Sequence, residues 1–115
     1  MIFRKWLKEH GYNPKIYLKI VKYNAQQSGY NPDNLSFCDD GIHKLEYTTE
    51  NKKVKFGRST YHDFLLWTWD EFKGDVPEGT GEKKRHNYLT RATNIKGNWK
   101  NNPVSPNNLA INILW

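Results

Sequence analysis

Apolar residues in the first thirty positions recur with the period of a helix. Residues 2–9 and 14–28 predict two helices, because apolar side chains three and four residues apart share one helical face. Between them, Asn13 suits an N-cap and Pro14 suits the first position of the second helix. The apolar positions of the two segments are Ile2, Phe3, Trp6, Leu7, Ile16, Tyr17, Ile20, Val21 and Ala25. The N-terminal part is therefore expected to be two amphipathic helices.

The middle of the chain has short apolar runs separated by turn residues, a pattern typical of antiparallel strands. Asp39-Asp40-Gly41 is a turn signal between two such runs. The run 64–69 is apolar on both faces, so it predicts the most buried strand, and Gly57 suits a bulge. The segments expected in strands are 35–37, 42–47, 54–56 and 61–69. Together they predict an antiparallel meander of three or four strands.

The last third of the chain returns to the helical pattern after a loop at residues 73–82. Residues 83–95 predict a helix whose apolar side chains face the sheet. Ser105 suits the N-cap and Pro106 the first position of a last helix, and Trp115 is expected to be docked against the core. The apolar positions of the two helices are Tyr88, Leu89, Ala92, Ile95, Leu109, Ala110, Ile113 and Leu114.

Chain length and segment order predict a single domain of the α+β class. The chain has 115 residues, and domains most often hold about 100–150 residues. Its expected parts are N-terminal helices at 1–30, a β-meander at 31–72 and a basic helical segment at 83–115. The two helices of the last segment are expected to pack on the meander.

Charge is distributed unevenly along the chain, whose formal net charge is +6. Residues 1–30 carry six basic side chains and one acidic one, and residues 83–115 carry six basic side chains and no acidic one. Residues 31–82 carry six basic and eleven acidic side chains. If the two basic ends meet in space, they form one positive surface of the kind that binds polyanions. The alternative is that the lysines only keep the protein soluble.

A set of short motifs is spread over residues 29–115. They are Gly29-Tyr30-Asn31-Pro32, Asp40 to Leu45, Lys55-Phe56-Gly57, Tyr61-His62-Asp63-Phe64, Lys84-Arg85 with Tyr88 and Arg91, Ile95 to Trp99, and Ser105 to Ala110 with Ile113-Leu114-Trp115. Together they resemble a small domain family of unknown function encoded by nucleocytoplasmic large DNA viruses, the giant viruses. The resemblance implies a viral origin, a shared fold and a setting in the cytoplasm or nucleus of the host, in virus factories or in the virion. It supplies no catalytic residue.

Residues 83–91 are the strongest candidate binding site. On a helix, Lys84, Tyr88 and Arg91 share one face, and cations at the helix N-terminus can hold phosphate together with the backbone N–H groups there. The alternative is a solvated basic face in which Tyr88 is buried and Arg91 is paired with an acid. The residues expected to contact nucleic acid are Lys15, Lys19, Lys22, Lys83, Lys84, Arg85, Tyr88, Arg91, Lys96, Trp99 and Lys100.

Trp99 lies between cations and amides, so it has two interpretations. An indole flanked by Lys96 and Lys100 can stack a base while the cations hold phosphate. The interpretation that we favour is a Trp that fills the edge of the core between two helices, because indole area is rarely left without a partner. For Asn107 and Asn108, we likewise favour helix-start chemistry over contacts with an adenine edge.

Catalytic and metal-binding patterns are not evident in the sequence. The four histidines and Cys38 have no recognisable ligand spacing, so neither a metal site nor a cofactor is expected. Glu46, Lys55 and Asp63 on predicted strands support one enzymatic alternative, a metal-dependent nuclease. An ion pair between Asp63 and Arg85 or Arg91 is the simpler interpretation of that carboxylate.

The partner classes follow from composition. No apolar run approaches the roughly 20 residues that span a bilayer, and the N-terminus lacks the apolar stretch of a secretory signal, so no membrane contact is expected. The resulting prediction is a basic, non-enzymatic module that binds nucleic acid. The alternative is a virion structural or adaptor protein that binds an acidic protein surface.

Overall fold

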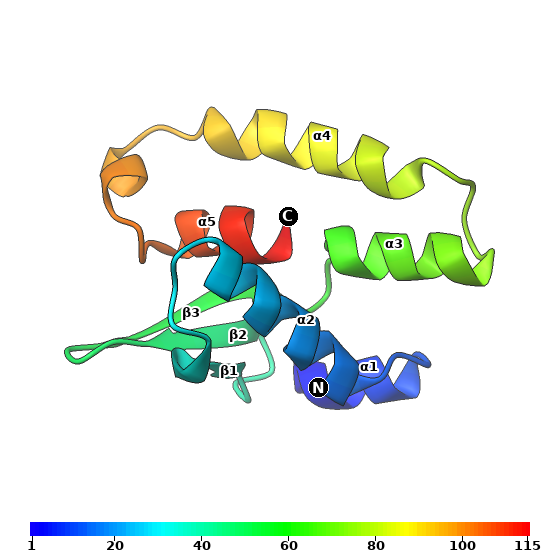
Figure 1. Cartoon of the computed structure of the whole chain (residues 1–115), viewed down its shortest axis with the longest axis horizontal. Helices are drawn as coiled ribbons and strands as arrows, with labels where there is room; N and C mark the ends of the chain where they lie inside the picture. Colours follow the sequence, from blue (N-terminus) through cyan, green and yellow to red (C-terminus); the bar gives the residue numbers. More distant parts are fainter.

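The computed structural model describes all 115 residues and combines a three-stranded antiparallel sheet with helices at both ends of the chain (Figure 1). The α+β class expected from the sequence is confirmed. The main elements are α1 (Phe3–Glu9), α2 (Pro14–Gln27), β1 (Leu35–Phe37), β2 (His43–Thr48), β3 (Lys53–Arg58), α3 (Phe64–Lys73), α4 (Thr80–Thr93) and α5 (Pro106–Leu109). Short 3₁₀ turns lie at Pro32–Asn34 and Asn98–Asn101, and a π-helical turn at Ala110–Leu114 follows α5. None of the helices has the length and apolar character required to cross a lipid bilayer.

The two N-terminal helices form where the sequence predicts them. The Asn13 side chain accepts a hydrogen bond from the backbone N–H of Ile16, so it caps α2. α2 buries Tyr17, Val21 and Ala25, which are spaced four residues apart on one face. This face packs against β1 and the π-helical turn, and thereby connects the N-terminal part to the end of the chain.

The sheet has the strand order β1-β2-β3. Leu35 pairs with Tyr47 across β1 and β2, and Leu45 pairs with Phe56 across β2 and β3. These buried side chains join those of the helices in one core. The core members are Phe3, Leu7, Tyr12, Tyr17, Val21, Ala25, Leu35, Leu45, Tyr47, Val54, Phe56, Leu66, Leu109, Ala110, Ile113 and Leu114.

Residues 61–69 do not form a strand, so the sequence prediction for this segment and for a meander reaching residue 72 is wrong. α3 begins at Phe64 because the Asp63 side chain accepts a hydrogen bond from the backbone N–H of Leu66, as an N-cap does. Gly74 ends the helix in the left-handed conformation, with φ at +81°. The hydrogen-bonding side chain before the run, rather than the apolar run itself, thus sets the structure.

α4 begins at Thr80, ahead of residue 83, and lies along α3 instead of covering the sheet (Figure 1). Tyr88, which was expected to face the sheet, stacks on Trp115 with ring centroids 4.3 Å apart. Ile95, expected on the same side, is 49% exposed. The helix that does pack on β3 is α5.

The C-terminal segment is docked, as the sequence predicts. The Ser105 hydroxyl accepts from the backbone N–H of Asn108, which caps α5. Ile113 and Leu114 are buried in the core. Arg85 donates to the backbone oxygen of Trp115 at 2.8 Å, so α4 and the end of the chain are joined directly.

Candidate nucleic-acid interface

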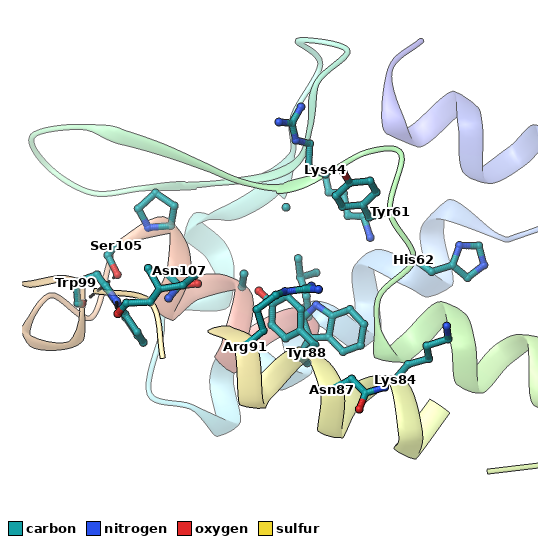
Figure 2. A pocket seen from close by; sticks show the side chains of 17 residues that line it. Lys44, Tyr61, His62, Lys84, Asn87, Tyr88, Arg91, Trp99, Ser105 and Asn107 are labelled. Carbon is teal, nitrogen blue, oxygen red and sulfur yellow. Dashed lines mark hydrogen bonds between the residues drawn. The ribbon is translucent and has the colours of Figure 1, made fainter. Parts of the chain in front are cut away.

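A cleft of about 760 Å³ lies between α4 and the end of β3, with α5 and the C-terminal residues along its base (Figure 2). It exists because α4 packs on α3 and on Trp115 and not on the sheet. The cationic side chains that line it are Lys44, Arg58, Lys84 and Arg91. No Asp or Glu side chain lines it. The charged side chains that line the cleft are therefore all cationic.

Three predicted residues of α4 meet in this cleft. Lys84, Tyr88 and Arg91 follow each other at helical spacing, and Figure 2 shows their side chains on the side of α4 that faces the cleft. The Arg91 guanidinium lies 5.8 Å from the centre of the Tyr88 ring. Burial raises the pKa of Tyr88, and the Arg91 charge opposes that rise. The phenol thus stays neutral and can donate a hydrogen bond to an anion.

The three outer cations of the cleft have no acidic partner. Arg58, Lys84 and Arg91 are exposed side chains, and none of them forms an ion pair. The Lys84 ammonium lies over a neutral ring, 5.0 Å from the centre of Trp67. Grouping unpaired cations in a hollow raises the local positive potential. A bound anion would offset it.

Aromatic rings accompany these cations. Tyr61 is 67% exposed at the rim, and Trp99 is half-buried at one end of the cleft (Figure 2). The Trp99 indole N–H donates to the backbone oxygen of Ile95 at 2.8 Å, so only the ring face is free for a ligand. Trp99 is neither in the core nor among the half-buried apolar residues packed on it, so the structure does not bear out the favoured interpretation, and the ring lines the cleft instead. Asn107 bridges to α4 by donating to the Ala92 carbonyl.

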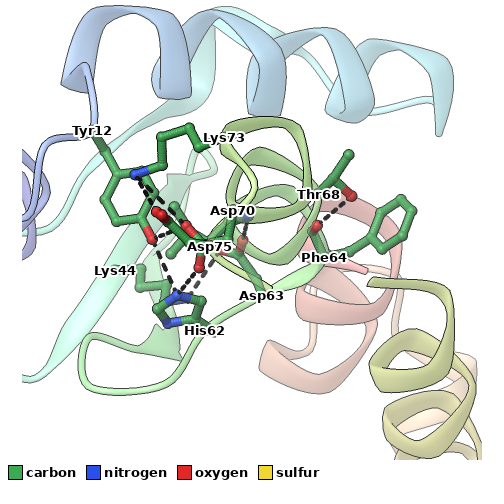
Figure 3. Close-up of polar contacts among 10 residues, drawn as sticks. Tyr12, Lys44, His62, Asp63, Phe64, Thr68, Asp70, Lys73 and Asp75 are labelled. Atoms are coloured by element: carbon green, nitrogen blue, oxygen red, sulfur yellow. Dashed lines mark hydrogen bonds and ion pairs between the residues drawn. The ribbon is translucent and has the colours of Figure 1, made fainter. Parts of the chain in front are cut away.

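His62 lies at the other end of the cleft, in a fixed orientation. Its Nε2 is 2.9 Å from Asp70 Oδ2, and the Tyr12 hydroxyl donates to Asp70 Oδ1 at 2.6 Å (Figure 3). Because the Asp70 carboxylate accepts both bonds, His62 carries its proton on Nε2. Burial, and then the hydrogen bond to Asp70, raises the pKa of Tyr12 well above its usual value. Tyr12 is therefore a neutral donor at neutral pH.

Lys44 lies beneath the cleft and has a structural role. Its ammonium is 2.9 Å from Asp63 Oδ2, and the two residues are 2% and 0% exposed. Burial lowers the pKa of Lys44, and the Asp63 charge opposes that shift. Asp63 was expected to pair with an arginine of α4. Its partner is Lys44 instead, because α4 does not reach the buried position of the Asp63 carboxylate.

The residues of the nuclease alternative do not gather into one site. Asp63 is fully buried and occupied by Lys44 and Tyr17. Glu46 lies on the sheet with its carboxylate 3.0 Å from the Lys53 ammonium. Two carboxylates held in these separate ion pairs cannot share a metal ion.

Backbone N–H groups at the start of α4 are not free for phosphate, contrary to the sequence hypothesis. The Glu71 carboxylate of α3 accepts from Gly79 N at 3.2 Å and also from Gly81 N. A carboxylate of the protein thus occupies the place expected for a bound anion. Lys84 acts from the side of the helix, not from its end.

The other predicted contact residues lie outside the cleft. Arg85 is committed to the Trp115 backbone oxygen, and Lys100 lies 5.6 Å from the centre of the Trp99 ring. Lys15 lines a second hollow near the N-terminus, together with Arg4, Lys5 and Lys8. The remaining members are on the surface: Lys19, Lys83 and Lys96 are exposed, and Lys22 is half-buried.

The two ends of the chain meet where α2 packs on the π-helical turn, but no residue lines both the N-terminal hollow and the cleft. Figure 1 shows α3 between the N-terminal helices and α4. The N-terminal hollow and the cleft therefore present separate positive regions. The polar cleft residues that sequence reasoning missed as contacts include Lys44, Arg58, Tyr61, His62 and Asn87. Of these, Arg58 had the only usable signal, as a cation that directly follows Gly57 and ends β3.

Comparison with known proteins supplies no relative: no family model, no curated protein and no solved structure matches the chain. The functional argument accordingly rests on the cleft.

Proposed function

We propose that the protein is a non-enzymatic nucleic-acid-binding module whose cleft between β3 and α4 holds the sugar-phosphate backbone. One observation carries the proposal: three cations without acidic partners, Arg58, Lys84 and Arg91, line a single hollow that contains no carboxylate side chain. Phosphate contacts from Arg and Lys are the usual source of affinity for nucleic acid.

The rings in the cleft favour single strands over duplex. Tyr61 and the face of Trp99 lie beside the cations, and aromatic faces stack on bases only where the bases are not already stacked in a helix. A single strand can place a phosphate at Arg91 and a base against a neighbouring ring. The resemblance to a family of large DNA viruses adds a proposed setting, in which the strand is viral DNA or RNA in a virus factory or virion.

An acidic protein surface is the competing partner. Carboxylates can occupy the same cations, but they make no use of the exposed ring of Tyr61. Nucleic acid satisfies both features of the cleft, so it is the preferred ligand. The two partners differ in a measurable way, because only the strand should gain affinity from stacking.

The test is titration of a labelled oligo(dT) with the protein, followed by fluorescence anisotropy over a range of salt concentrations. Each phosphate that is neutralised on a single strand contributes a slope of about −0.7 to log K against log salt. We expect Arg91→Ala to weaken binding about 5–20-fold, which is one lost charged contact of roughly 1–2 kcal/mol, and to flatten the slope by about one contact.

The matched control is Lys96→Ala, which removes the same charge from an exposed residue outside the cleft. It should leave affinity within about twofold, and thermal melting should show that both variants are folded. Equal losses for Arg91→Ala and Lys96→Ala would indicate diffuse charge attraction and overturn the cleft. Displacement of the oligonucleotide by poly-glutamate at equal charge concentration would assign the cleft to an acidic protein partner.

A further inference from the structure

The connection between β1 and β2 brings together three side chains with different donor atoms. The thiol sulfur of Cys38, a carboxylate oxygen of Asp40 and a ring nitrogen of His43 all lie within 4.8 Å of one another. In the sequence their spacing resembles no common ligand pattern. The hairpin brings the three residues together, because the chain folds back on itself between Cys38 and Lys44. The backbone N–H of Cys38 donates to the carbonyl of Lys44 at 3.0 Å.

The three donors are held in place by the loop itself. Asp40 Oδ1 accepts from the backbone N–H groups of Ile42 and His43, both at 2.8 Å. Asp40 Oδ2 is 2.7 Å from His43 Nδ1. Cys38 is 1% exposed at the base of the loop, while the Asp40 and His43 side chains are 20% and 36% exposed. The Cys38 sulfur is therefore held in the interior, while the Asp40 and His43 side chains can be reached from solvent.

We propose that Cys38, Asp40 and His43 form a three-ligand site for a transition-metal dication, with Zn²⁺ as the preferred ion. Thiolate and imidazole are ligands of Zn²⁺, whereas Ca²⁺ and Mg²⁺ take oxygen ligands almost alone. Tetrahedral Zn²⁺ lies about 2.0–2.3 Å from such donors. The Asp40 and His43 atoms, which are 2.7 Å apart as hydrogen-bond partners, must therefore move slightly apart to share the ion with the Cys38 sulfur. Water takes the fourth position on the exposed side.

Zn²⁺ binding releases one proton from the site. The Cys38 thiol gives up its proton to solvent and becomes a thiolate ligand. The neutral His43 ring carries its proton on Nδ1 when it donates to Asp40, so it must move that proton to Nε2 before Nδ1 can bind the metal. The net reaction is one Zn²⁺ taken up and one proton released.

The Lys53 charge acts on the Cys38 sulfur, and a second cation that opposes the site is Lys55. Its ammonium lies 3.6 Å from Asp40 Oδ2, but the side chain is 44% exposed and free to turn outward. A bound dication would repel it. The site should consequently be weaker than a four-ligand structural zinc site, and the fold does not depend on the metal, because the hydrogen bonds of Asp40 already order the loop.

Cobalt(II) is the probe for this site, because a thiolate ligand produces an intense charge-transfer absorption that carboxylate or imidazole alone does not. The full chain is titrated with Co²⁺ under reducing conditions, and Zn²⁺ is then added to displace it. We expect one Co²⁺ per chain with a thiolate band, and complete loss of the band on addition of Zn²⁺.

Three variants and one control separate the site from a simple thiol. Cys38→Ser should remove the band, and His43→Gln and Asp40→Asn should each weaken Co²⁺ binding at least tenfold. His86→Gln alters an exposed histidine of α4 and should bind as the parent does. His43→Gln keeps the buried residues of the hairpin intact, so it reports on the site even if Cys38→Ser destabilises the fold. Absence of the band at millimolar Co²⁺, or a band unchanged in His43→Gln and Asp40→Asn, overturns the proposal.

Discussion

Asp63 is the residue on which most of the polar core converges. Its carboxylate accepts from the Tyr17 hydroxyl at 2.5 Å, the Lys44 ammonium at 2.9 Å and the backbone N–H of Leu66 at 2.9 Å. One side chain thus caps α3, neutralises a buried lysine and ties α2 to both. Fully hydrogen-bonded buried networks of this kind are sensitive to the loss of any member.

Replacing Lys44 should therefore be costly. In Lys44→Met the Asp63 carboxylate loses its counter-charge while it stays buried, and we expect a loss of about 3–5 kcal/mol in the free energy of unfolding. Adding Asp63→Asn should restore part of that stability, because the neutral amide still accepts from Leu66. Urea denaturation measures both. Lys53→Met is the control, because the Lys53 side chain in its pair with Glu46 is 56% exposed, and it should cost about 1 kcal/mol or less.

Gly57 shows the same dependence on tertiary contacts at a single position. Its φ of +77° favours glycine, and a Cβ there would come within 2.8 Å of the Leu114 side chain. The sequence indicated a bulge or bend at this residue. It did not reveal that the reason is the close approach of the C-terminal segment.

At the scale of elements, the apolar run 64–69 explains the main error of prediction. Trp69 packs edge-on against Tyr12 with centroids 5.4 Å apart, while α4 covers another side of α3. A helix that has neighbours on several sides carries apolar residues around its whole circumference. Over six residues, such a helix has the same continuous apolar sequence as a strand that is buried on both faces. Only the N-cap Asp63 distinguishes the two, and the same residue type is also common in turns.

The C-terminal segment is expected to be part of the core and not a removable tail. Deletion of residues 112–115 removes buried Ile113 and Leu114, worth roughly 1.5–3 kcal/mol each, together with the Trp115 ring that holds Tyr88. That loss is comparable with the 5–15 kcal/mol net stability of a typical domain. The truncated protein should melt far lower or be insoluble, as followed by circular dichroism.

Ile95→Ala provides the comparison for this truncation, because Ile95 is 49% exposed and should cost less than about 1 kcal/mol. If the truncated chain melts like the full chain, the assignment of the last segment to the core is wrong. The cleft should also be lost in the truncated chain, since Leu114 and Trp115 line it.

At the scale of the whole molecule, two phenols join the N-terminal helices to α3. Tyr12 donates to Asp70 and Tyr17 donates to Asp63. Burial raises the pKa of both phenols, and the neighbouring carboxylates raise it further. In the unfolded chain the same phenols ionise near pH 10. Their contribution to stability is therefore fully present below about pH 10 and is lost as pH rises toward the folded-state values.

Alkaline pH should accordingly destabilise the protein, because ionised Tyr12 and Tyr17 can no longer donate hydrogen bonds to Asp70 and Asp63. We expect the free energy of unfolding to fall as pH rises above about 10, as measured by urea denaturation at several pH values. Tyr12→Phe should be less stable at neutral pH but should show a shallower alkaline decline. Tyr23→Phe alters a tyrosine that is 60% exposed and should keep the parent slope. An identical slope in Tyr12→Phe would contradict the role given to Asp70.

The sequence by itself determined the features that depend on neighbouring residues. The caps at Asn13 and Ser105, the amphipathic face of α2 and the shared face of Lys84 and Arg91 all follow from local spacing. The uneven distribution of charge was equally visible. Tertiary structure alone decided where these parts came to lie, because long-range packing, and not local preference, placed α4 on α3 and left the cleft open toward Arg58. Packing likewise chose Lys44 as the partner of Asp63 and brought Cys38 to His43, since distances across a fold are not encoded in spacing along the chain.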